Sequence, residues 1–296
     1  MPELPEVQTI VDDLNKRIVG RKVAGVWYDW PKTIKKPKAT DLEKEIRGLK
    51  IEEIKRRGKN ILIYLSKGVD KSAYLLLIHL KMTGHLLYGN WQMKNNKPVF
   101  PGKGFLSEKV NSYIHLIFYL DNGLELALSD LRKFAKVIFG PAEEIEKLGE
   151  LHKIGPEPLN QSFKVGKFIS LISPQRRKIK QVLMDPKVIA GIGNIYSDEI
   201  LWQAKIHPLR SANSLKPEEL EKIYKSIRQI LEKALKLRGT SVSDFRDPLG
   251  KPGLYGKKLL AYRRGGEPCL RCGVKMKRLK MGGRSSCYCS RCQILK

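Results

Sequence analysis

The sequence lacks any long apolar stretch. The longest, around Ala73 to His79, is far shorter than the roughly 20 residues that span a bilayer and fits a buried strand. The first residues are acidic and carry no hydrophobic region, so we expect no signal peptide and a cytoplasmic location. Repeats and low-complexity segments are absent as well. An apolar content of 42% in 296 residues indicates a globular chain with two domains and a small appendix.

Acidic residues are scarce relative to basic ones. The 30 Asp and Glu face 57 Lys and Arg, which leaves a formal net charge of +27. A surplus of this size favours a polyanionic partner, because each phosphate that a protein neutralises releases counterions. We favour nucleic acid over an anionic membrane surface, since the basic residues are spread along the chain and do not form a polybasic tail.

Hydrophobic patterns predict an α+β multidomain protein. Residues 1–145 contain one helical pattern, from Glu6 to Ile18, and otherwise short β-branched or aromatic runs between turn residues, which predicts a β-sandwich with an N-terminal helix. Residues 146–261 are mainly helical and include a GPEP linker at 155–158. Residues 262–296 form a short basic tail. The predicted strands are 61–65, 74–78, 113–120, 124–128 and 137–139, and the predicted helices of the second region are 179–184, 198–204 and 217–237.

No cysteine occurs before position 269, which argues against a disulfide framework in a cytosolic chain. Two CxxC pairs, Cys269–Cys272 and Cys289–Cys292, flank a 16-residue connection, a spacing typical of a four-thiolate zinc ribbon. We predict one structural Zn²⁺, whose binding supplies the folding free energy of a tail too short for its own core. Cys287 is then a packing thiol.

The connection between the two CxxC pairs, KMKRLKMGGRSS, is basic and holds a glycine pair just before Arg284. Two consecutive glycines suit the tight turn of a hairpin. We expect the hairpin tip to present Arg284 to DNA, and an ordinary solvated hairpin is the alternative interpretation.

The chain opens with MPELPEV. Its prolines and carboxylates can simply start the first helix, because proline fixes φ and acidic groups favour the N-terminal end of the helix dipole. Alternatively, the terminus itself is a reagent. PELPEV, GIGNIY at 191–196, GKPG at 250–253 and the four-cysteine ribbon occur in this order. Together they resemble the bacterial formamidopyrimidine-DNA glycosylase family over essentially the whole chain.

The resemblance implies a β-sandwich domain, a helix–two-turn–helix domain and a zinc finger, with duplex DNA bound in the cleft between them. The implied function is base-excision repair: removal of oxidised purines such as 8-oxoguanine and formamidopyrimidines, then cleavage of the abasic strand by β,δ-elimination. We expect a monomer. The alternatives are an endonuclease VIII-like glycosylase for oxidised pyrimidines and a non-catalytic DNA-binding zinc protein.

The resemblance also implies catalytic roles. Removal of Met1 would leave Pro2 as a secondary amine with an ordinary pKa of about 8. At neutral pH the unprotonated fraction of such an amine is larger than that of a lysine side chain. Its attack on C1′ of the sugar gives a covalent iminium. Glu3 matches the general acid and Lys59 the proton donor for β-elimination, although Lys59 can also contact phosphate within its basic run. Arg284 matches a finger arginine that contacts phosphates and assists δ-elimination.

Two loops resemble the family's DNA-wedging segments. HLKMTG at 79–84 resembles HLGMSG and places Met82 as a wedge, while DLRKF at 130–134 resembles DPRRF and supplies Arg132 and Phe134. Apolar wedges with an arginine suit unstacking of the duplex and contact with the orphaned base. Core packing is the alternative for Met82 and Phe134. Three residues depart from the family pattern and put the local loop geometry in question: Lys81, Leu131 and Ala135.

Further DNA contacts are expected in the second region. Arg176 aligns with a basic DNA-contacting position, and Asn194 follows a glycine-rich turn where helix N–H groups suit a phosphate, unless it merely caps the helix. Tyr113 stands where a DNA-contacting histidine is expected, so that contact is not carried over, and His115 matches a family histidine of open role. Residues 240–255 resemble the loop that closes over an extruded 8-oxoguanine, which favours the purine branch.

Overall fold

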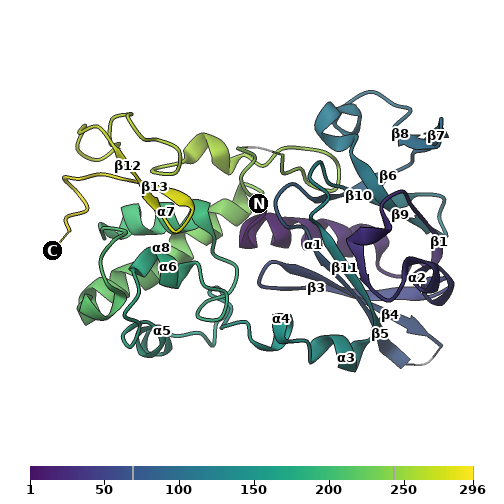
Figure 1. Cartoon of the computed structure of the whole chain (residues 1–296), viewed down its shortest axis with the longest axis horizontal. Helices are drawn as coiled ribbons and strands as arrows, with labels where there is room; N and C mark the ends of the chain where they lie inside the picture. Colours follow the sequence, from purple (N-terminus) through teal and green to yellow (C-terminus); the bar gives the residue numbers. More distant parts are fainter. Residues whose placement is uncertain (69, 243, 296) are drawn as a thin grey trace. The chain divides into compact units, whose positions relative to one another are not determined.

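The computed structural model describes residues 1–68, 70–242 and 244–295, so Ser243 of the 240–255 stretch and Lys296 of the tail lie outside the described residues. The chain forms two compact units, one of Met1–His152 with Leu237–Leu254 and one of Lys153–Lys236 with Tyr255–Lys296 (Figure 1). Segment 237–254 therefore folds with the N-terminal unit, although in sequence it follows the helices of the other unit. The boundaries at 145 and 261 stay a prediction from sequence pattern.

Two sheets build the N-terminal unit. A four-stranded sheet has the order β1–β9–β10–β6, and a five-stranded sheet has the order β2–β11–β5–β4–β3. Strand β2 pairs with β11 in parallel, and the other neighbours are antiparallel. The strands are β1 Val23–Tyr28, β2 Ile34–Lys36, β3 Lys50–Arg57, β4 Asn60–Lys67, β5 Asp70–His79, β6 His85–Gly89, β9 Ile114–Leu120, β10 Glu125–Ser129 and β11 Lys136–Pro141.

Buried side chains of both sheets and of helix α1 (Leu4–Ile18) form one core cluster, which confirms the predicted sandwich with an N-terminal helix. Helix α1 is amphipathic because its apolar residues recur at helical spacing and lie on one face. Helix α2 (Ala39–Ile46) covers the same core with Leu42 and Ile46. The predicted turn at 121–123 joins β9 to β10, with Gly123 at φ 75°.

Smaller elements decorate this unit. Strands β7 (Gln92–Lys94) and β8 (Lys97–Val99) form a hairpin, and short helices α3 (Ala142–Glu146) and α4 (Gly149–His152) follow the sandwich. Single 3₁₀ turns lie at Pro31–Thr33, Phe105–Ser107 and Lys109–Asn111. The sequence patterns did not predict these short pieces, since three to five residues are too few to show a period.

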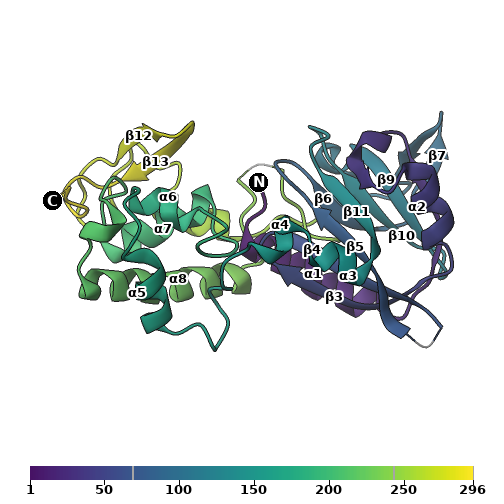
Figure 2. The ribbon, with the colours of Figure 1, turned by 60° about the horizontal axis from the view of Figure 1, so that its bottom comes forward.

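Helices dominate the second unit: α5 (Val165–Ile172), α6 (Ile179–Leu183), α7 (Asn194–Ala204) and α8 (Pro217–Lys236), with 3₁₀ turns at Ala212–Ser214 and Tyr255–Lys258. The longest, α8, packs against α7 and α5 (Figure 2). Helix α6, two turns across 184–193 and α7 form the expected helix–two-turn–helix arrangement. Within residues 1–68, 70–242 and 244–295, no helix combines the length and apolarity needed to cross a bilayer.

The unit ends in an antiparallel hairpin of β12 (Lys277–Met281) and β13 (Arg284–Tyr288). Gly282 and Gly283 form its two-residue turn at φ 53° and 73°. Positive φ at both positions is what a two-residue turn of the right twist requires, and glycine adopts it without a steric penalty. The predicted hairpin is confirmed, with an exposed Arg284 directly after the turn.

Candidate functional site

The N-terminus is a buried, capped helix start. Pro2 and Glu3 are buried, Glu3 is the N-cap of α1, and Pro5 lies in the first turn. The Glu3 carboxylate accepts the Glu6 backbone N–H while the Glu3 N–H donates to Glu6 Oε2 at 2.7 Å. This reciprocal capping box satisfies two otherwise unpaired donors of the first turn. It fixes the direction of the backbone at residues 1 and 2, which precede the cap.

The terminal amine lies in a charged but poorly hydrated environment. Burial lowers the pKa of the Met1 α-amino group, and the nearby Lys59 ammonium lowers it further, whereas Glu3, Glu6 and Asp244 act in the opposite direction. An amine whose pKa falls below its ordinary value is more often unprotonated, and so more nucleophilic, at neutral pH. The structure thus brings Lys59, more than fifty residues away in sequence, near the chain start that carries Pro2 and Glu3.

Lys59 lies in the turn between β3 and β4, beside helix α1. Gly58, at φ 58°, makes the turn possible. The Arg56 guanidinium donates to the Gly58 carbonyl at 2.8 Å and to Gln8 Oε1 of α1 at 2.8 Å. Arg56, three residues before Lys59, therefore holds the turn against the helix. The sequence did not indicate this structural contact.

His79 is a neighbour of Lys59 that sequence reasoning missed. Burial lowers the pKa of His79 to about 3, and the charges of Lys81 and Lys59 act in the same direction. Its Nδ1 accepts the Lys81 backbone N–H at 3.0 Å, so the neutral ring carries its proton on Nε2. A hydrogen-bonding but uncharged imidazole therefore stands near the lysine.

Glu6 has a second partner besides the N-cap. Its Oε1 accepts the Thr240 backbone N–H at 2.7 Å, while Oε2 serves the N-cap. A Cβ on Gly239 would lie 2.7 Å from Glu6 Oε1, so glycine is needed there. Glu6 therefore fastens segment 237–254 onto the start of α1.

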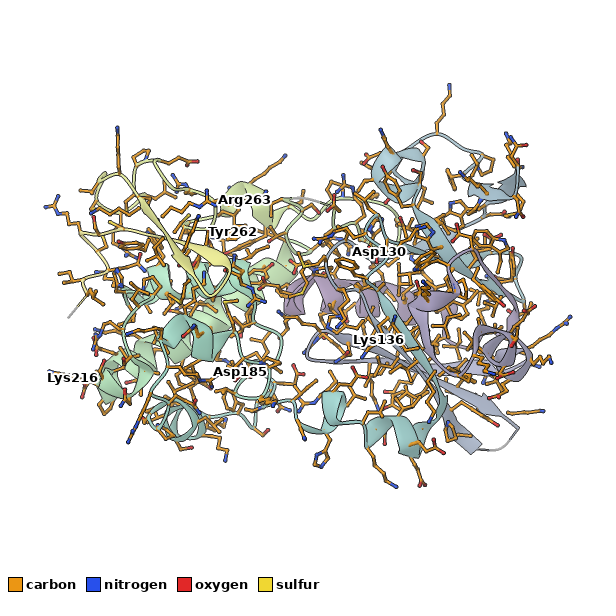
Figure 3. All side chains as sticks on the ribbon, viewed as in Figure 1. Asp130, Lys136, Asp185, Lys216, Tyr262 and Arg263 are labelled. Carbon is orange, nitrogen blue, oxygen red and sulfur yellow. The ribbon has the colours of Figure 1, made fainter. Side chains whose placement is uncertain are left out.

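The loops carrying Met82 and Arg132 are joined by a single buried carboxylate. Asp130, labelled in Figure 3, is 2% exposed and accepts the Thr83 hydroxyl through Oδ1. Its Oδ2 accepts the backbone N–H groups of Phe134 and Ala135, each at 2.7 Å. Several hydrogen bonds to one carboxylate hold both loops in a defined conformation.

The expected wedge residues are exposed in these fixed loops. Met82 is 43% and Phe134 51% exposed, as is their neighbour Leu131 at 49%, which excludes core packing. The Arg132 guanidinium lies 4.5 Å from the centre of the Phe134 ring. Lys81, which departs from the family pattern, adopts φ 55°. The turn therefore forms despite the departure, because Thr83 and Asp130 determine its geometry.

In the second unit, Asn194 is the first residue of α7 and Gly193 is its N-cap, so the side chain of Asn194 is not the cap. Asn194 Oδ1 is buried and has no hydrogen-bond partner among the described residues. Arg176 is exposed in the turn before α6. The backbone N–H groups at the start of α7 and an exposed arginine suit polar contact with a phosphate, whereas Asn194 Oδ1 is itself an acceptor and needs a donor.

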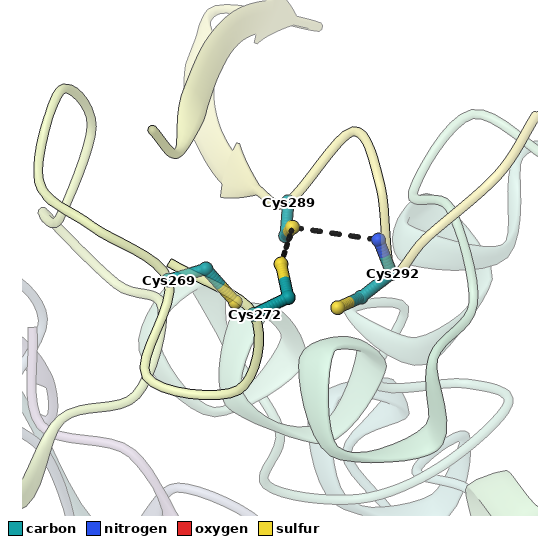
Figure 4. Close-up of side chains that lie close together, drawn as sticks. All are labelled: Cys269, Cys272, Cys289 and Cys292. Atoms are coloured by element: carbon teal, nitrogen blue, oxygen red, sulfur yellow. Dashed lines mark hydrogen bonds between the residues drawn. The ribbon is translucent and has the colours of Figure 1, made fainter. Parts of the chain in front are cut away.

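The four predicted zinc ligands converge (Figure 4). The thiol sulfurs of Cys269, Cys272, Cys289 and Cys292 lie within 4.8 Å of one another, and those of Cys272 and Cys289 are 3.4 Å apart. Zn–S bonds of about 2.3 Å in a tetrahedron place sulfurs about 3.8 Å apart, so the cluster fits one structural Zn²⁺.

The surroundings of the cluster fit the metal as well. The buried Trp202 packs in the same cluster as Cys269 and Cys289, and its indole N–H acts as a donor toward the Cys269 sulfur. Thiolates bound to zinc would offer it an acceptor. Cys287 is buried outside the four-sulfur cluster, which agrees with a packing role.

Two buried carboxylates of α7, not predicted from sequence, attach the finger. Asp198 pairs with Lys180 of α6 at 2.6 Å and accepts the Ser286 hydroxyl at 2.5 Å and the Cys287 N–H at 3.1 Å. Glu199 accepts the backbone N–H groups of three consecutive residues, 260–262, each at 2.8 Å. The hairpin that carries Arg284 is therefore tied to the helix that begins at Asn194.

Comparison with known proteins agrees with this arrangement. Three family models match in order: the formamidopyrimidine-DNA glycosylase N-terminal domain at residues 1–137, its H2TH domain at 154–246, and a zinc finger found in FPG and IleRS at 266–294. The formamidopyrimidine-DNA glycosylase of Pelotomaculum thermopropionicum is 38% identical over 296 residues, with 100% of both chains covered. The chain belongs to the formamidopyrimidine-DNA glycosylase family.

Solved structures of the family align over nearly the whole chain. A complex of a Lactococcus lactis family variant with DNA containing Fapy-dG is 32% identical, with a TM-score of 0.85 over 99% of this chain and 100% of that one. A complex of the wild-type Lactococcus lactis protein with DNA containing an oxidised pyrimidine is also 32% identical, with a TM-score of 0.84 and the same coverage. Each of these two family members was thus captured on damaged DNA.

Proposed function

We propose that this protein removes oxidised purines from duplex DNA and then cleaves the abasic strand. The observation that carries the proposal is the grouping at the start of α1, where Glu3 and Lys59 are charged neighbours of the terminal amine, which Met1 bears in this structure and Pro2 would bear once Met1 is removed. Family membership supports the same activity, and the net charge of +27 suits a polyanionic substrate.

Pro2 is the proposed nucleophile once Met1 is removed. Its nitrogen attacks C1′, the C1′–N bond to the damaged base breaks, and the base leaves with the bonding electrons and takes up the proton that the amine loses. Glu3, as general acid, donates a proton to the ribose ring oxygen, so the sugar opens to an iminium on Pro2. The cationic iminium acidifies the C2′ hydrogens, and loss of one of them expels the 3′ phosphate.

The other site residues take supporting roles. Lys59 donates protons during β-elimination, and Arg284 contacts phosphates near the lesion and assists δ-elimination. Met82 and Phe134 fill the space left by the extruded nucleotide, and Arg132 contacts the orphaned base. In the second unit, Arg176 and Asn194 bind backbone phosphates. These contacts hold the duplex while the base is out of the stack.

A second candidate substrate is an oxidised pyrimidine. The complex of the Lactococcus lactis protein with an oxidised-pyrimidine duplex keeps this candidate open. The GKPG stretch at 250–253, in the segment that Glu6 fastens to α1, favours the purine. The two candidates share nucleophile and fold and differ only in the base that the site accepts.

Borohydride trapping tests the proposal. Duplexes with 8-oxoguanine or an oxidised pyrimidine are incubated with the protein, the imine is reduced, and the adduct is located by N-terminal sequencing. We expect a Pro2 adduct, formed faster on the purine duplex. A faster adduct on the pyrimidine duplex would reassign the substrate, and intact DNA binding without any adduct would leave a binding protein only.

Variants separate the roles of the first two residues. Glu3→Gln should lower base release by roughly 10²–10⁴-fold and leave duplex binding intact, because glutamine can still accept the capping N–H. Pro2→Gly should weaken trapping, since a primary amine gives an imine that can lose its charge. Normal base release by Glu3→Gln would refute the mechanism.

A further inference from the structure

Arg238, in the segment that follows α8, has an unusual backbone conformation. Its φ is 60°, and the next residue, Gly239, is at 77°. The left-handed region is sterically unfavourable for residues with a Cβ, and glycine is the residue that normally occupies it. Six other described non-glycine residues also have a positive φ, Lys205 at the end of α7 among them, so the side-chain contacts of Arg238, and not its backbone conformation, distinguish this position.

Two acidic side chains bind Arg238. The Arg238 guanidinium donates to both carboxylate oxygens of Asp13, on helix α1, through Nη1 at 3.3 Å and through a shorter contact from Nη2. Nη2 also reaches Asp247 Oδ2 at 2.6 Å. The side chains of Asp13 and Asp247 are only 10% and 3% exposed, so the guanidinium neutralises two largely buried charges.

Asp247 in turn shapes the far part of the segment. Its Oδ1 accepts the backbone N–H groups of Leu249 at 2.9 Å and Lys251 at 3.0 Å. The Pro248 carbonyl accepts the Tyr88 N–H of β6 at 2.7 Å. Through Asp247, Arg238 therefore connects the turn at 247–251 to α1 at Asp13, seven residues after Glu6.

We propose that Arg238 is a positioning residue that holds segment 237–254 on helix α1 in the geometry that receives the extruded base. This rests on the proposed function and on the resemblance of residues 240–255 to the loop that closes over an extruded 8-oxoguanine. Arg238 touches no reacting atom. Its planar fork serves two carboxylates at once, which a lysine ammonium on a flexible stem does not reproduce.

Arg238→Gly is the variant that tests the proposal, because glycine adopts φ 60° without strain and so removes the ion pairs without stressing the backbone. We expect 8-oxoguanine excision to fall by about 10–100-fold, the size of effect that misplacement away from the chemistry can have. Cleavage of a preformed abasic site, which has no base to hold, should change by less than about twofold on the same reasoning. Amide exchange in peptides covering 237–254 should become faster.

Three further variants control the experiment. Lys205→Gly also removes a cation at φ 60°, but Lys205 is an exposed residue at the end of α7, so both reactions should match wild type. Asp13→Asn removes the charge of one of the two carboxylates that bind Arg238. It should slow excision and leave cleavage of a preformed abasic site nearly unchanged. Arg238→Lys should behave more like Arg238→Gly than like wild type.

The outcomes are distinguishable. Wild-type excision by Arg238→Gly, unchanged amide exchange in 237–254, or an equal loss of excision and abasic cleavage would each overturn the positioning role. Failure of the wild-type protein to excise any oxidised base would instead refute the proposed function. In that case faster exchange in Arg238→Gly would still support the structural tether.

Discussion

Two buried aspartates, one in each compact unit, organise the loops expected to meet DNA, and they do so with different partners. Asp130 is 2% exposed and binds neutral donors only: a hydroxyl and backbone N–H groups of its own unit. Asp198 is 1% exposed and binds the Lys180 ammonium together with donors from the zinc hairpin. One aspartate forms a hydrogen-bonded turn, and the other forms a buried ion pair linked to a metal site.

Because the partners of the two aspartates differ, different interactions stabilise the loops that they hold. Hydrogen bonds from neutral groups each contribute a modest net free energy, and the donors of Asp130 belong to a sandwich with a large core of its own. A buried ion pair is costly to break because the remaining charge loses its partner. The finger adds a further dependence, since its hairpin has few buried residues and relies on zinc.

Metal removal should show the largest contrast. A structural zinc site contributes about 10–16 kcal/mol to folding of the segment it holds, so chelation should abolish amide protection across 262–295. Strands β9, β10 and β11 should keep theirs, because no zinc ligand lies in the sandwich. Hydrogen exchange followed by mass spectrometry measures both regions at once. Retained protection of the finger in metal-free protein would contradict the site.

Asp198→Asn should produce the next largest effect. It leaves Lys180 buried without a counter-charge, and such losses cost about 3–5 kcal/mol. Urea unfolding of the intact protein measures the change. The double variant Lys180→Met with Asp198→Asn is the matched control and should recover part of the loss, because no buried charge remains. If the double variant is as unstable as the single one, the ion pair is not the cause.

Much of this could be predicted from sequence, for a physical reason. The strands at 61–65 and 124–128, the helix from Glu6 and the zinc ligands are encoded by short-range patterns, namely period, turn glycines and CxxC spacing. The tethers were not predicted. Glu6–Thr240 and Arg238–Asp13 join residues more than two hundred positions apart, and no local pattern encodes such a pair.

The departures from the family pattern illustrate the same limit. Lys81 and Leu131 suggested altered loops, yet Asp130 and Thr83 keep the loops in place through contacts that single positions do not reveal. In such a sequence, the polar residues to examine are therefore those to which the family resemblance assigns no role, inside loops that resemble the family's. Asp130 in DLRKF is an example. An aspartate at the start of a turn can accept hydrogen bonds from the backbone N–H groups of the residues that follow it, and it then holds the turn in one conformation.

Asp130→Asn should give the smallest effect, about 1–3 kcal/mol of stability, the usual cost of leaving buried donors without an acceptor. The asparagine amide has one acceptor oxygen, so it can serve Thr83 or the N–H groups of Phe134 and Ala135 but not both sets. Urea unfolding measures the loss, and exchange of the two amides locates it. Asp121→Asn, an exposed position in the turn after β9, is the control and should change neither quantity. A loss as large as that of Asp198→Asn would mean that the neutral network of Asp130 behaves as a buried ion pair does, and the contrast between the two units would disappear.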